Sequence, residues 1–123
     1  MNRFWLITAA ISGLLSVALG AFGAHALKDV LNLYSREIYE KAVQYHMFHT
    51  VALLAVGLLQ NLQPHSSLAG AGWSFLLGLL LFSGSLYLLA ITGAKWWGAI
   101  TPLGGTAFLL GWAWLAYALL RGR

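Results

Sequence analysis

The chain alternates between long runs of uncharged, mostly apolar residues and short clusters of charge. After Arg3 no charged residue occurs until Lys28, and none occurs from residue 42 to 94 or from 96 to 120. A helix needs about 20 apolar residues to cross the roughly 30 Å hydrocarbon core of a bilayer. The pattern therefore predicts membrane-spanning helices, with two of them in the longest run.

Turn-forming residues divide these runs into four predicted spans. We expect them at residues 4–24, 42–60, 68–93 and 102–120. Pro64, within the polar string that follows Gln60, ends the second span. Thr101 followed by Pro102 is typical of a helix start, because proline lacks the N–H that the first turn leaves unpaired anyway. The expected fold class is all-α, an integral membrane four-helix bundle in a single domain.

The segment between the first two spans has an apolar stripe on one helical face and charges on the other. The stripe consists of Leu27, Leu31, Tyr34, Ile38, Ala42 and Tyr45. Two structures fit this pattern equally well: a short amphipathic helix lying in the membrane interface, and an extension of the second span into water. We take the short amphipathic interfacial helix between spans one and two as the working expectation.

The first apolar run also has an alternative interpretation, as a secretory signal. Arg3 precedes it, and Ala24, His25 and Ala26 fit a small-x-small cleavage pattern. The run is longer than the 7 to 15 residues usual for a signal core, and its small residues are spread along it. Both features favour a permanent span.

Small residues recur at four-residue spacing in the first span, at Ser12, Ser16, Gly20 and Ala24. Such rows let helices approach closely in lipid. A moving or dimerising interface and static packing inside the bundle use the same residues. We expect static packing.

Aromatic residues are expected to mark the two membrane boundaries, where their amphipathic rings are favoured. Trp5, Trp73, Trp114 and Tyr117 belong to one boundary, and Trp96, Trp97, Tyr39 and Tyr87 to the other. The seven basic residues divide four to three between the two sides, so charge does not decide the orientation.

Composition places the chain in lipid rather than in water. Charged residues make up 8% of the 123 positions and hydrophobic residues 60%, whereas an ordinary soluble domain carries charge on about a quarter of its positions. The net charge of +4 does not indicate nucleic acid, because no clustered basic face with aromatic readers occurs. Without cysteine, disulfides and thiolate metal sites are excluded. We expect a multi-pass protein surrounded by the lipid bilayer.

Polar residues gather in the leaflet that borders the charged first loop. The cluster consists of His25, Gln44, Tyr45, His46, His49 and Thr101. Polar side chains within a membrane usually face the interior of a bundle and often mark a functional site. We therefore treat this cluster as the candidate site.

His46 and His49 lie three positions apart and so are neighbours on one helical face. Such a pair could offer two ring nitrogens to a metal or haem iron, and His25 could be a third ligand. No aspartate or glutamate lies in any span to orient them. We expect no cofactor, with a membrane metal or haem site at His25, His46 and His49 as an alternative to a structural hydrogen-bonded cluster.

Catalytic motifs are absent from the sequence. There is no G-x-S-x-G, no phosphate-binding glycine loop with lysine, and no pair of carboxylates within the spans. We expect a non-enzymatic bundle that binds a lipid or a partner membrane protein, or associates as a homo-oligomer. A proton-coupled carrier of small solutes is a further alternative, and it would need an oligomer because four short spans leave little room for a path.

Four segments carry a resemblance to a known family. They are G-A-F-G-A-H-A-L-K at residues 20–28, A-V-Q-Y-H-M-F-H at 42–49, L-F-S-G-S-L-Y at 81–87 and I-T-P-L-G-G at 100–105. Together they resemble the small bacterial membrane proteins typified by YgdD and YwdK, a family of unknown function, along nearly the whole chain. The resemblance implies a multi-pass location in the cell membrane (the bacterial inner or plasma membrane) and no assigned activity. All six residues of the polar cluster lie inside these segments.

Overall fold

Each long uncharged run forms a helix in the computed structural model, which describes residues 2–64 and 67–121. The helices are α1 (Phe4–His25), α2 (Leu33–Leu62), α3 (Ala69–Gly78), α4 (Gly84–Thr92) and α5 (Thr101–Arg121). A π-helical segment, η1 (Leu79–Ser83), joins α3 to α4, and a 3-10 segment, η2 (Lys95–Ala99), precedes α5. The described ranges contain no strand. The expected all-α fold is confirmed.

Within the described residues, four helical stretches are long and apolar enough to cross a membrane: α1, α2, the run Ala69–Thr92 and the run Lys95–Arg121. The spans expected at 4–24, 42–60 and 102–120 lie inside these helices, and the one expected at 68–93 exceeds its helix by a residue at each end. The 22 residues of α1 measure about 33 Å at 1.5 Å per residue, which suits a hydrocarbon core of roughly 30 Å.

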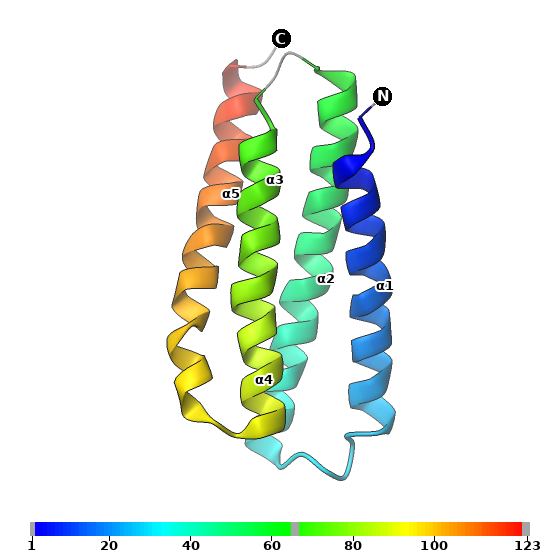
Figure 1. Ribbon diagram of the computed structural model, residues 1–123, viewed down its shortest axis with the longest axis vertical. Coiled ribbons are helices and arrows are strands. Elements are labelled where there is room, and N and C mark those ends of the chain that lie inside the picture. The colour runs from blue at the N-terminus through cyan, green and yellow to red at the C-terminus, as the bar shows by residue number, and fades with distance from the viewer. Residues whose placement is uncertain (1, 65–66, 122–123) are drawn as a thin grey trace.

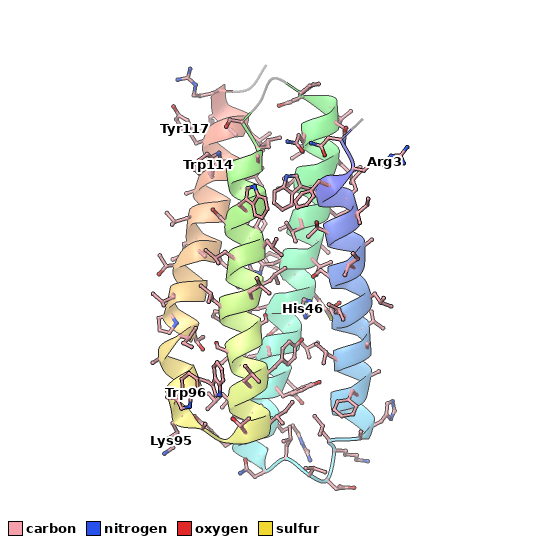
Figure 2. The ribbon with its side chains drawn as sticks, in the orientation of Figure 1. Arg3, His46, Lys95, Trp96, Trp114 and Tyr117 are labelled. Atoms are coloured by element: carbon pink, nitrogen blue, oxygen red, sulfur yellow. The ribbon has the colours of Figure 1, made fainter. Side chains whose placement is uncertain are left out.

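The helices run up and down beside one another (Figure 1). α1 packs along α2 and α3 along α5, and α2 also packs against α3, η1 and α4. We name the two ends of the bundle after residues labelled in Figure 2, the Trp114 end and the Lys95 end. Because α2 contacts both halves of the bundle, its side chains connect α1 with the helices that follow.

The expected separate interfacial helix is not formed between α1 and α2. The chain makes turns and bends from residue 26 to 31, and α2 then runs without interruption from Leu33 to Leu62. Asn32 sets this start, because its side chain accepts a hydrogen bond from the backbone N–H of Ser35, 2.8 Å away. Of the two structures that fitted the apolar stripe, the structure has the extension of the second span.

A π-helical turn interrupts the third span where α5 comes closest. Gly104 of α5 lies against the backbone of η1, and a Cβ atom at this position would overlap the backbone nitrogen of Phe82. π-helical turns inside α-helices occur frequently at functional sites. Here the turn ends at Ser83, whose side chain is buried.

The apolar core fills the half of the bundle toward the Trp114 end. Its largest fully buried side chains are Phe75, Leu53, Leu68 and Val56, and Trp5 and Phe108 pack around them. Of the row of small residues in α1, Ser12 and Ser16 are buried, whereas Gly20 is half-buried and Ala24 is exposed. The two serines pack within this chain, where Ser12 contacts Thr50 and His46 of α2.

Aromatic side chains mark both ends of the bundle, but three of the expected eight, Trp5, Tyr39 and Tyr87, turn into its interior. Figure 2 shows Trp114 and Tyr117 at one end and Trp96 at the other. Tyr39 is buried, with its hydroxyl donating to the carbonyl of Leu19, and its ring meets that of Tyr87 edge to face at 5.2 Å. Tyr39 has its hydroxyl partner on α1 and its ring partner on α4, whereas Tyr87 meets His46 and Tyr39 of α2.

Candidate functional site

The two central histidines of α2 turn toward different neighbours. His46 faces α1 and α4, where it contacts Ser12 and Tyr87, and His49 faces α5, where it contacts Trp112. Both are buried, at 8% and 3% exposure. Their spacing placed them on one side of α2, but the rings reach separate clusters.

His46 belongs to a chain of four hydrogen bonds that ties α1, α2 and α4 together. Its Nδ1 lies 2.9 Å from the hydroxyl of Tyr87, and its Nε2 lies 3.1 Å from Oγ of Ser12. Oγ of Ser12 is 2.5 Å from Oγ1 of Thr50, which donates to the carbonyl of His46 at 2.8 Å.

The direction of every bond in this chain follows from its last member. The single hydroxyl proton of Thr50 is used on a carbonyl, so Ser12 must donate to Thr50. Ser12 then has no proton left for His46 and accepts from its Nε2–H. A charged imidazole is costly in a membrane span without a carboxylate partner, so the ring is neutral and Nδ1 accepts from the hydroxyl of Tyr87. His46 is a neutral imidazole protonated on Nε2.

His49 has the opposite tautomer, by the same reasoning. Its Nδ1 lies 2.9 Å from the carbonyl of Tyr45, which can only accept, so Nδ1 carries the proton. Its Nε2 accepts from the indole N–H of Trp112 at 3.1 Å. The ring also stacks on Phe108, with centroids 3.5 Å apart and planes 7° from parallel. Hydrogen bonds and stacking together fix the position of this imidazole.

His25, the third candidate ligand, does not join the other two histidines. It is exposed and lies at the end of α1. Within residues 2–64 and 67–121, no three His, Cys, Asp or Glu side chains are grouped so that they could hold a metal ion. All four ring nitrogens of His46 and His49 have partners, so a metal would first have to displace a hydrogen bond. The metal or haem site and the proton-coupled carrier stay predictions.

The remaining candidates lie around these two clusters. Tyr45 is 38% exposed, and its ring packs on Phe82 at 4.5 Å. Gln44 is exposed on α2. Thr101 makes a separate contact at the Lys95 end, where its hydroxyl is 2.6 Å from that of Ser85. That bond joins the start of α5 to α4 and does not reach either histidine.

Sequence reasoning missed the partners of the histidines. Tyr87 was assigned to a membrane boundary, and Trp112 was not singled out. A usable signal exists, because a buried imidazole needs partners and only Trp and Tyr combine an apolar ring with one polar group. It could not choose between Trp112 and the other five tryptophans of the chain.

A groove between α2 and α5 extends from Lys41 past His49 to Trp112. Its volume is about 810 Å³. Lys41 and Gln44 line one part of it, and Phe48, Phe108 and Trp112 line the rest. The wall on the α5 side includes Gly105, which has no side chain, and Thr106, whose side chain is short, so the space stays open. A charged mouth therefore continues into an aromatic trough.

Comparison with known proteins gives the chain a family. Residues 19–105, which include His46, His49, Tyr87 and Gly104, match the family described as protein of unknown function (DUF423). The chain belongs to the DUF423 family. The matched range begins within α1 and ends just inside α5. It contains the members of both histidine clusters apart from Ser12, Phe108 and Trp112.

Relatives in several bacteria cover the chain almost completely. The inner membrane protein YgdD of Escherichia coli is 45% identical over 98% of this chain and 92% of its own length. The membrane protein YwdK of Bacillus subtilis is 42% identical over 97% and 98%. A membrane protein of Haemophilus influenzae is 42% identical over 100% and 98%. No solved structure matches. With the four apolar helices, these relatives confirm a multi-pass protein of the cell membrane.

Proposed function

We propose that this DUF423 protein binds an anionic phospholipid in the groove between α2 and α5 and acts without catalysis or a cofactor. The observation that carries the proposal is the groove itself, with Lys41 at its mouth and aromatic rings along its length. A lipid fits this arrangement better than a polar solute, because only the mouth carries a charge.

The depth of the groove corresponds to one leaflet of a bilayer. Lys41 is the last charged residue before the uncharged part of α2, so it lies at the headgroup level. From Lys41 to His49 the helix rises by about 12 Å, at 1.5 Å per residue. Half of a roughly 30 Å hydrocarbon core is about 15 Å. A phospholipid with its headgroup at Lys41 would therefore place an acyl chain along Phe48 and Phe108.

The side chains at the mouth suit a phosphate and the ester groups beneath it. The ammonium of Lys41 supplies three hydrogen-bond donors and a positive charge, and the amide of Gln44 lies one turn deeper. Below them, Phe108 and Trp112 offer flat apolar surfaces. His49 contributes shape rather than charge, since both its nitrogens already have partners.

A charge-removing variant and a groove-filling variant test the proposal. Protein in nanodiscs with a small share of phosphatidylglycerol in phosphatidylcholine should enrich phosphatidylglycerol in the lipid that native mass spectrometry finds retained. Lys41→Gln should abolish the enrichment. Gly105→Phe should lower total retained lipid, because the new ring would occupy the trough.

Lys95→Gln is the matched control, since Lys95 lies at the same end of the bundle and is exposed, but does not line the groove. Retention should stay at the wild-type level in this variant. Equal losses in Lys41→Gln and Lys95→Gln would show general surface attraction and reject the groove. A second protein that stays bound to this chain in the mass spectra would favour a partner membrane protein instead. A dimer that forms whether or not lipid is present would favour a homo-oligomer.

A further inference from the structure

A second groove lies on the other side of α2, between α1 and the π-helical turn. Its volume is about 280 Å³. Ser12 and His46 line it on one side, and Leu80, Ser83 and Tyr87 on the other. Leu80, at 65% exposure, and Ile11, at 54%, form its rim. Because the surface at this depth faces lipid, the groove opens to the bilayer.

One polar atom in this groove has no partner. Ser83 is 1% exposed, and its Oγ makes no hydrogen bond with any other described residue. In contrast, the side chains of Ser12, His46 and Tyr87 make hydrogen bonds to one another or to Thr50. An unpaired hydroxyl in hydrocarbon is costly. Native structures contain few such groups, and each one requires an explanation. The hydroxyl of Ser83 is available to donate.

The position of the groove restricts what could accept this bond. Ser83 lies nine residues before the end of α4 at Thr92, a rise of about 14 Å, and still farther from the start of α3. Headgroups and ester carbonyls of phospholipids lie near the boundary, so they do not reach this depth. No charged side chain lines the groove, which excludes an ionic ligand.

We infer that this groove binds a neutral, lipid-soluble molecule with a carbonyl oxygen, of the quinone class, and that the oxygen accepts a hydrogen bond from Ser83. The apolar rim holds the ring and its substituents, and the oxygen of Tyr87, which donates its own proton to His46, offers an acceptor for a hydroxyl of the reduced form. The site does not use Lys41 or the groove at His49, so it stands independently of the proposed phospholipid site.

The test uses decyl-ubiquinone labelled with ¹³C at a ring carbonyl, added to the full-length protein in nanodiscs. We expect saturable binding and a carbonyl infrared band at lower wavenumber than in empty nanodiscs. Ser83→Ala should weaken binding at least tenfold and remove the shifted band. Gly84→Leu should also weaken binding, because a Cβ at Gly84 would lie 3.9 Å from the backbone oxygen of Leu79 without a clash, and the larger side chain would enter the groove.

Folding does not confound this test. Ser83→Ala removes a hydroxyl that has no partner, so the variant should unfold no more easily than the wild type. Ser16→Ala is the matched control, a buried serine of α1 outside the groove that donates to the carbonyl of Gly13. It should bind the quinone as the wild type does. The inference would be overturned if Ser83→Ala bound the quinone as tightly as the wild type does. It would also be overturned if the wild type showed no saturable binding and NMR spectra showed water in contact with the Ser83 hydroxyl.

Discussion

The indole N–H of Trp112 on α5 donates to Nε2 of His49 on α2, at 3.1 Å. The same imidazole donates through Nδ1 to its own helix, at the carbonyl of Tyr45. The bond between Trp112 and His49 bridges α2 and α5 beside the groove proposed for a phospholipid. It also sets the protonation state of His49, because a proton on Nε2 would oppose the N–H of Trp112.

Removing the indole N–H should loosen this bridge. Trp112→Phe keeps an aromatic ring near Phe75 but leaves Nε2 of His49 buried without a donor. The expected loss is about 1–3 kcal/mol of unfolding free energy, measured by SDS titration of the purified protein. Trp96→Phe is the control, because Trp96 is 60% exposed and stacks on its neighbour Trp97. Equal stability of both variants would contradict the bridge.

The two histidines should show opposite tautomers. In long-range ¹H–¹⁵N spectra of labelled protein, His46 should carry its proton on Nε2 and His49 on Nδ1. His46→Gln and His49→Gln assign the signals. The same tautomer for both rings would show that the hydrogen-bond directions derived from Thr50 and Tyr45 are wrong.

Ser12 and Thr50 should be energetically coupled across α1 and α2. Their hydroxyls are 2.5 Å apart, and Ser12 also accepts from His46. A double-mutant cycle of Ser12→Ala and Thr50→Val should give a coupling of about 0.6 kcal/mol, the average for hydrogen bonds between membrane helices, and no more than about 1.7 kcal/mol. Additive losses of stability would mean that the short contact contributes nothing.

Adjacent glycines at the start of α5 should respond differently to the same substitution. Gly104→Ala places a methyl group on the backbone of η1 and should cost about 1–3 kcal/mol of stability. Gly105→Ala should be close to neutral, because its Cβ would lie 3.8 Å from the ring of Phe82. Thermal unfolding in detergent distinguishes them, and a neutral Gly104→Ala would contradict the close approach of α5 to η1.

Metal content tests the alternative based on His25, His46 and His49. The hydrogen bonds to both central rings lead us to expect no stoichiometric metal and no haem absorption in the purified protein. Elemental analysis and an absorption spectrum measure both. A metal or haem signal that disappears in the double variant His46→Ala, His49→Ala would establish the site and reject the structural role.

Sequence reasoning placed the membrane spans and the two histidines, but not the environment of those histidines. Gln60 and Leu120 ended the second and fourth expected spans close to the ends of α2 and α5. His46 and His49 were suspected because an imidazole within an apolar run needs an explanation. The segment before the second span was harder, since the same stripe suits a surface helix and an extended α2, and only the cap at Asn32 within the fold distinguishes them.

The difference has a physical cause. Whether a stretch crosses the membrane depends on the hydrophobicity of its own residues against a solvent common to all four helices, so the order of residues alone decides it. Whether Tyr87 reaches His46, or Trp112 reaches His49, depends on how far each helix is rotated and where it crosses its neighbours. Those positions follow from packing among residues as distant in sequence as Gly104 and Phe82, and only the assembled bundle determines them.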